Sequence, residues 1–66
     1  MNVHDHAYPF TLERWSRGFR APYEAVGGSL NQILARALFR AAVEHEPGGW
    51  WRLRHGARVL AQWPEG

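Results

Sequence analysis

The chain has 66 residues with eight arginines, no lysine and no cysteine, and its formal net charge is +2 at pH 7. This length allows one small domain, and the lack of cysteine excludes disulfides and thiolate metal sites. No apolar leader follows Met1, and no apolar run approaches the roughly 20 residues that cross a bilayer, so we expect a soluble, cytoplasmic protein without a membrane partner.

Aromatic and arginine side chains are the most informative part of the composition. The chain contains four tryptophans, two tyrosines and three phenylalanines. Trp, Tyr and Arg carry much of the binding energy at protein interfaces, so this composition favours a binding protein over an enzyme. Two reasons for arginine without lysine stay open: a GC-rich genome, which the abundant Ala and Gly support, and selection for planar, bidentate contacts that lysine does not make.

The N-terminal part is expected to be a flexible arm that precedes a single compact domain. Residues 1–9 show no hydrophobic periodicity, whereas residues 10–66 carry the apolar pattern of the fold. Within the arm, His4 and His6 flank an aspartate, but two ligands do not complete a tetrahedral metal shell. We therefore predict no metal site.

Short helices are predicted in the segment that follows the arm. Leu12, Trp15 and Phe19 recur at helical spacing and would lie on one face of a short N-terminal helix. Proline disfavours helix at the residue before it, so a break is expected ahead of Pro22. Pro22–Val26 is suitable for a second short helix, because proline is acceptable in a first helical turn.

A long helix over residues 29–46 is the strongest element of the sequence. Ser29 and Gln32 match a capping box at its start, and Pro47 ends it. Apolar residues keep the helical period along it, at Leu30, Ile33, Leu34, Ala37, Leu38, Ala41 and Ala42. We expect this main stripe to face the core.

A second apolar patch lies nearly opposite the main stripe, at Phe39 and Val43. One interpretation is a helix that is sandwiched within its own fold. The other is that a partner or a second copy of the chain packs on Phe39 and Val43. Because a surface helix normally has one apolar stripe, we predict a homodimer that uses this patch for self-association.

Residues 50–63 have the pattern of a β-hairpin around His55-Gly56. The preferred register has a three-residue loop, which pairs Leu53 with Ala57, Arg52 with Arg58 and Trp51 with Val59. It collects an apolar face at Trp51, Leu53, Ala57, Val59, Ala61 and Trp63. A two-residue loop is the alternative, but it mixes charge into both faces, and a buried face fixes strand register. We expect this hairpin to pack on helix 29–46, and the fold class is therefore predicted to be α+β.

The outer face of the hairpin is the candidate partner-binding site, formed by Trp50, Arg52, Arg54 and Arg58. In the preferred register Arg52 opposes Arg58, and a like-charge cross-strand pair is unfavourable. One interpretation is that Glu44, Glu46 or Glu65 neutralises the arginines. The other is a docking surface for an acidic protein patch or a phosphate backbone.

No catalytic residue and no cofactor site is predicted. Ser16 and Ser29 have no histidine and acid in a recognised arrangement, and the chain has no phosphate-binding or dinucleotide fingerprint. Gly27-Gly28 precedes a helix N-terminus, where anions bind, but no Lys-Ser or Lys-Thr follows it. We interpret this pair of glycines as an ordinary turn.

Two functions fit these features, and we favour the first. It is a small non-enzymatic regulator or inhibitor that binds an acidic protein surface; small proteins of this kind are typical of phages and mobile elements, where anti-CRISPR inhibitors are one type. The second is a winged-helix-like DNA-binding protein, because the predicted elements follow the order of a minimal winged helix. Arg36 and Arg40 would then face the groove, although the net charge is low for a nucleic-acid-binding protein.

Overall fold

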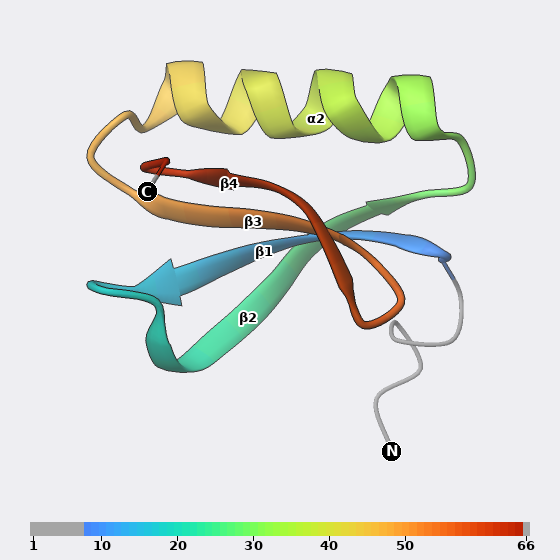
Figure 1. Ribbon diagram of the computed structural model, residues 1–66. Coiled ribbons are helices and arrows are strands. Elements are labelled where there is room, and N and C mark those ends of the chain that lie inside the picture. Colours follow the sequence, from blue (N-terminus) through green and yellow to red (C-terminus); the bar gives the residue numbers. More distant parts are fainter. Residues whose placement is uncertain (1–7, 66) are drawn as a thin grey trace.

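A four-stranded antiparallel sheet with a helix across one face accounts for residues 8–65, the part of the chain that this computed structural model describes (Figure 1). The elements in chain order are β1 (Phe10–Ser16), β2 (Arg20–Ser29), α2 (Gln32–His45), β3 (Trp50–His55) and β4 (Arg58–Trp63). The strands lie in the order β2-β1-β3-β4, so β1 and β3 are central. The chain is therefore α+β, built from two hairpins that are joined through the helix.

Most of the predicted arm over residues 1–9, including His4 and His6, lies outside the described residues. Tyr8 and Pro9 are described, and both contact the domain. The Tyr8 ring lies so close to Gly28 that a Cβ on this glycine would be 2.8 Å from the ring. The Gly56 N–H donates a hydrogen bond of 3.2 Å to the Pro9 carbonyl.

The two predicted N-terminal helices are wrong, because residues 10–29 form the antiparallel hairpin of β1 and β2. β1 pairs with β2 on one side and with β3 on the other. These long-range hydrogen bonds outweigh a weak local helix preference, and aromatic residues such as Trp15 and Phe10 are well suited to strands. Pro22 is tolerated because β2 is an edge strand.

The β1–β2 turn holds an aromatic residue in the left-handed region of backbone conformation. Gly18 has a φ of 76° and Phe19 a φ of 56°. Two successive residues with positive φ match the twist of a β-hairpin. Glycine adopts such a φ easily, but a bulky side chain does so at a cost of order 1–3 kcal/mol. Tertiary contacts of the Phe19 ring therefore have to hold the turn.

The core lies between α2 and the central strands. Its buried apolar side chains come from β1, α2 and β3: Leu12, Ala35, Trp51 and Leu53. The small side chain of Ala35 lets the helix approach the sheet closely. Over β2 the approach is closer still, because a Cβ on Gly27 would lie 2.9 Å from Cδ2 of Leu38.

Only part of the predicted main stripe of α2 faces the sheet, because Leu38 packs on Gly27 whereas the N-terminal residues of the stripe are exposed. Leu30, Ile33 and Leu34 of the predicted main stripe are 73%, 79% and 63% exposed. Phe39 and Val43 are half-buried in a cleft that β4 residues also line. The helix has apolar residues on two sides, and their period does not say which side meets the sheet. The patch predicted for self-association is thus largely used within the chain.

The helix also begins later than predicted, with Asn31 and not Ser29 as its N-cap. The Asn31 Oδ1 accepts hydrogen bonds from the backbone N–H of Ile33 at 2.7 Å and of Leu34 at 3.2 Å. Ser29 is the last residue of β2, and its Oγ accepts from the N–H of Asn31 at 3.1 Å. Serine and asparagine are both good N-caps, so the length of β2 decides between them.

β3 and β4 form a hairpin as predicted, but in a different register. The pairs are Trp51 with Trp63, Arg52 with Gln62, Leu53 with Ala61, Arg54 with Val59 and His55 with Arg58. The loop is the two-residue Gly56-Ala57, and Gly56 has the positive φ, 61°, that the first position of a type II′ turn requires. Leu60 forms a bulge, so Ala61 and Trp63 lie opposite Leu53 and Trp51, and the polar Gln62 stays off the buried face.

Two indole groups clamp the connection between α2 and β3. The Trp51 Nε1–H donates to the Glu46 carbonyl at 3.0 Å, and the Trp63 Nε1–H donates to the Pro47 carbonyl at 2.9 Å. The Arg14 Nε donates to the Glu46 carboxylate at 3.1 Å. This hydrogen bond, with the charge of Glu46, raises the pKa of Arg14 above its ordinary value. The C-terminal end of α2 is thereby fixed over the sheet.

Candidate functional site

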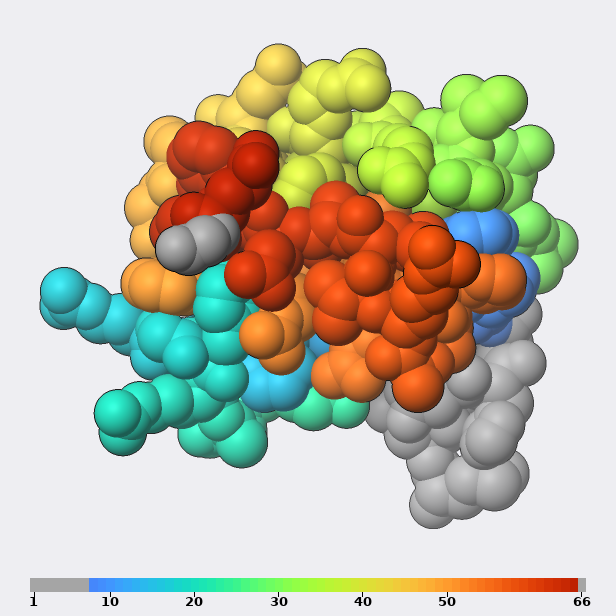
Figure 2. Space-filling view, in the orientation of Figure 1, coloured from blue at the N-terminus to red at the C-terminus, as the bar shows by residue number. Residues whose placement is uncertain are grey.

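The sheet face opposite α2 is not covered by any element of residues 8–65 (Figure 1). Side chains alternate along a strand, so the neighbours of the buried core residues point to this side. We call this surface the open face; its residues are Glu13, Trp15, Phe19, Tyr23, Trp50, Arg52 and Arg54. In Figure 2 the β1–β2 turn and the start of β2, in cyan, lie beside orange β3 and below the helix.

Aromatic rings from four segments meet on the open face. Trp15 of β1 stacks on Tyr23 of β2, with ring centroids 4.3 Å apart and an interplanar angle of 20°. Phe19 of the turn meets Trp50 of β3 edge to face at 5.0 Å. Both geometries are favourable for aromatic pairs. The contact with Trp50 also explains how the turn keeps Phe19 at a positive φ.

Arg52 lies over two of these rings. Its guanidinium carbon is 4.2 Å from the centroid of Phe19 and 4.8 Å from that of Trp15. Its Nε donates to Oε1 of Gln62 at 3.3 Å. A guanidinium within about 6 Å of a ring centroid is attracted by the negative face of the ring. Arg52 is therefore held in one orientation between β1, the turn and β4.

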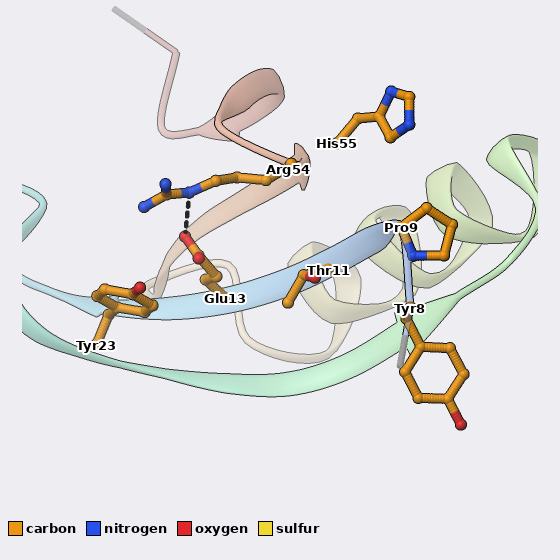
Figure 3. A pocket seen from close by; sticks show the side chains of 8 residues that line it. Tyr8, Pro9, Thr11, Glu13, Tyr23, Arg54 and His55 are labelled. Carbon is orange, nitrogen blue, oxygen red and sulfur yellow. Dashed lines mark hydrogen bonds and ion pairs between the residues drawn. The ribbon is translucent and has the colours of Figure 1, made fainter. Parts of the chain in front are cut away.

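Arg54 is held by a buried carboxylate. Its Nε lies 2.9 Å from Oε1 of Glu13, whose side chain is only 6% exposed (Figure 3). The Trp15 Nε1–H donates to the same oxygen at 2.9 Å. The Arg54 guanidinium also lies 5.5 Å from the Tyr23 centroid. No buried side-chain nitrogen or oxygen of residues 8–65 lacks a hydrogen-bond partner, so the burial of Glu13 is compensated.

An open hollow of about 600 Å³ adjoins this ion pair (Figure 3). Thr11, Glu13, Tyr23 and Arg54 belong to its lining. In Figure 3 Arg54 reaches from β3 to Glu13 on the neighbouring β1, whereas His55 points away from the pair. The hollow thus offers hydroxyl groups and one ion pair.

The predicted partner-binding residues are only partly brought together. Trp50, Arg52 and Arg54 share the open face, but Arg58 pairs with His55, and alternation along β3 places that pair on the other face. Arg52 is opposite Gln62, so the predicted repulsion between Arg52 and Arg58 is wrong. The reason is the position of the loop: His55 pairs with Arg58 across Gly56-Ala57, so Arg52 lies farther along the strand, opposite Gln62.

The acid that compensates the arginines was also not predicted. Glu46 pairs with Arg14 on the helix side, and Glu13 pairs with Arg54 on the open face. Glu13, Trp15, Phe19 and Tyr23 were missed as site residues because their segment was interpreted as helical. The alternation of the apolar Phe10 and Leu12 with the polar Thr11 and Glu13 was the signal that would have placed them on a strand.

Arg36 and Arg40 lie on α2 and line a cleft with Trp63 of β4. The sheet separates α2 from the open face, so these arginines form no common surface with Arg52 and Arg54. Residues 8–65 also contain one helix rather than the three of a winged helix. The winged-helix architecture is therefore wrong for this chain.

The described residues hold no group of three or more His, Cys, Asp or Glu side chains with the placement of a metal site. Their helix is too short and too polar to cross a bilayer. What the open face provides is a rigid array of rings and guanidinium groups. Compared with protein-family models, with curated proteins and with solved structures, the chain gave no match in any of the three searches.

Proposed function

We propose that this chain is a small non-enzymatic regulator that binds the acidic surface of a partner protein through its open face. The observation that carries the proposal is the pair Arg52 and Arg54, held over aromatic rings on an uncovered sheet face. Trp and Arg anchors that are fixed before binding lose little entropy when a partner docks.

The hydrogen bonds of the two arginines leave their outer groups for a partner. Arg52 and Arg54 each use Nε within the chain, toward Gln62 and Glu13. Within residues 8–65 no hydrogen bond engages their terminal amino groups. A guanidinium whose flat side rests on a ring still directs its N–H groups along its own plane, where a carboxylate binds in bidentate fashion. This arrangement suits Asp and Glu side chains of a partner.

A protein partner fits the open face better than a nucleic acid does. Single-strand binders stack bases on free aromatic rings. Here Trp15 is already stacked on Tyr23 and lies within cation–π distance of both arginines. Glu13 compensates one of the two arginines, and the net charge of the chain is only +2. Tyr23, which is 45% exposed, is the observation that favours single-stranded nucleic acid as a second candidate.

The test is capture of partners from the source cells by the full chain, with and without nuclease, followed by affinity measurements on the captured partner. We expect a nuclease-resistant protein whose binding weakens by more than about 1–2 kcal/mol in Trp50→Ala and in Arg52→Ala. Arg58→Ala is the matched control, because this arginine is exposed but lies off the open face.

Two results would contradict the proposal. Complete loss of binding after nuclease treatment would favour the nucleic-acid candidate, which a fluorescence titration with single-stranded oligonucleotides then checks. Equal binding by the wild type, Trp50→Ala and Arg52→Ala would remove the open face as the site.

A further inference from the structure

We propose that the outer side of α2 is an interface with a second copy of this chain. We call this surface the outer stripe; it consists of Leu30, just before the N-cap Asn31, and of Ile33, Leu34 and Ala37 of α2. The first three are 73%, 79% and 63% exposed. In Figure 1 no element lies above α2, and in Figure 2 the green start of the helix is an uncovered edge of the molecule. Adjoining exposed aliphatic side chains of this size mark interaction sites.

The fold of the single chain does not need the outer stripe. α2 is attached to the sheet through Ala35, which is buried, and through Leu38, which packs on Gly27. An amphipathic helix requires one apolar stripe for this purpose, and its opposite side is normally polar. The outer stripe is therefore an additional apolar surface of the kind that is found at interfaces.

The order of residues in the stripe favours an identical chain as the occupant. In an antiparallel, two-fold symmetric pair of helices centred between Ile33 and Leu34, Ile33 faces Leu34 of the second copy, and Ala37 lies toward the segment before the helix, which contains Leu30. Every residue of the stripe then meets an apolar residue. A two-fold interface uses the same patch on both copies, so such self-complementarity is its requirement.

The charges of α2 support the same centre. The charged or titratable residues Arg40, Glu44 and His45 are all exposed in the C-terminal half of the helix. A pair of helices centred at Ala37 instead would place Leu34 against Arg40. Centred between Ile33 and Leu34, the contact contains Arg36 as its one charged residue, at the flank and opposite the uncharged Asn31. No like charges meet in this arrangement.

The size of the stripe predicts a weak dimer. Because α2 begins at Gln32, two helices centred between Ile33 and Leu34 overlap over about one turn, and Leu30 and Ala37 extend the contact on either side. A standard interface covers about 800 Å² on each partner, which is about one-sixth of the 4735 Å² surface of this chain. The outer stripe supplies less than that, so we expect a dissociation constant in the micromolar range.

The first experiment is sedimentation velocity on the full chain over a concentration series from about 1 μM to about 1 mM. We expect the mass to rise from one chain to two, and Ile33→Asp to raise the dissociation constant at least tenfold. Ile33 lies in the first helical turn, where aspartate is favourable, so this variant folds. Gln32→Asp is the matched control: it adds the same charge at the adjacent exposed position, and we expect wild-type association.

The second experiment uses the absence of cysteine in the chain to test the symmetry directly. Leu34→Cys lies beside the two-fold axis and should form a disulfide-linked dimer under mild oxidation, whereas His45→Cys at the far end of α2 should not. A chain that stays monomeric over the whole series would overturn the proposal. So would a dimer that Ile33→Asp leaves intact, or equal cross-linking of the two cysteine variants.

Discussion

Glu13 organises the open face although the residue is only 4% exposed. One carboxylate oxygen accepts hydrogen bonds from Arg54 and from the indole of Trp15. Each of these partners contacts Tyr23 in turn. A buried charge is stable only when it is paired, so the carboxylate fixes the guanidinium and the ring together. Arg54 is therefore positioned before any partner arrives.

Phe19 combines a strained backbone conformation with a side-chain ring that makes favourable contacts. Its positive φ is unfavourable for a bulky side chain, but the ring contacts Arg52 and Trp50. Strain of this kind is found at functional sites, where the surrounding structure maintains it. The strain lowers the local stability of the turn, but it places the Phe19 ring against Arg52 and Trp50.

A pair of substitutions at Phe19 separates these two contributions. We expect the free energy of unfolding of Phe19→Gly to be about 1 kcal/mol higher than that of Phe19→Ala. Both variants lose the ring, but only glycine adopts the left-handed region without a steric cost. Urea denaturation of the two variants measures the difference. A Phe19→Ala protein that equals or exceeds Phe19→Gly in stability would show that the turn is not strained.

At the scale of elements, α2 has two apolar sides with different tasks. The inner side meets the sheet through Ala35 and Leu38, and the outer stripe faces solvent in the single chain. The two sides contain similar residue types, so hydrophobicity does not distinguish them. The inner side is buried and the outer side is exposed, so substitutions on the two sides should change the free energy of unfolding by different amounts.

Truncation of one leucine on each surface tests this division. Leu53 is fully buried beneath α2, so Leu53→Ala should lower the free energy of unfolding by about 2–5 kcal/mol. Leu34 is 63% exposed, so Leu34→Ala should change it by less than about 0.5 kcal/mol when measured on the dilute, monomeric chain. Similar losses for the two variants would mean that the outer stripe is covered within the single chain.

At the scale of the whole molecule, the sheet separates two surfaces of different chemistry. The open face carries rings and guanidinium groups, and the outer stripe on the other side of the molecule carries aliphatic side chains only. A dimer formed through α2 would leave both open faces accessible and directed away from each other. Two linked sites bind a multivalent partner more tightly than one site does.

The two surfaces should respond in opposite directions to salt. Raising the salt concentration from about 50 mM to about 500 mM should weaken binding of an acidic partner to the open face, because salt screens charge–charge attraction. Self-association through the outer stripe should stay constant or strengthen, and a sulfate salt should strengthen it most. Sedimentation and affinity measurements in the same buffers provide the comparison. Association of the chain with itself that disappears at high salt would contradict an aliphatic interface.

Several features of this protein were predictable from the sequence because they depend on local patterns. The α+β class, the helix after the Gly27-Gly28 pair and the hairpin of β3 and β4 follow from a helical period, a strand period and the glycines and prolines between them. The placement of Trp50 and Arg52 on one side of the sheet follows from the same strand period, whereas the preferred register places Arg54 at the tip and not in the strand.

Only the tertiary structure decided the rest. β1 fits a helical and a strand pattern equally, and pairing with both β2 and β3 selected the strand. The two-residue loop Gly56-Ala57 paired Arg58 with His55 and so removed Arg58 from the open face, and the bulge at Leu60 set the register of the remaining pairs. The sheet also determined which apolar side of α2 is buried, and it brought Glu13 to Arg54 across 41 positions of the chain. Local propensities differ by fractions of a kcal/mol, whereas strand pairing and core burial add over many contacts, so long-range packing prevails where local signals are balanced.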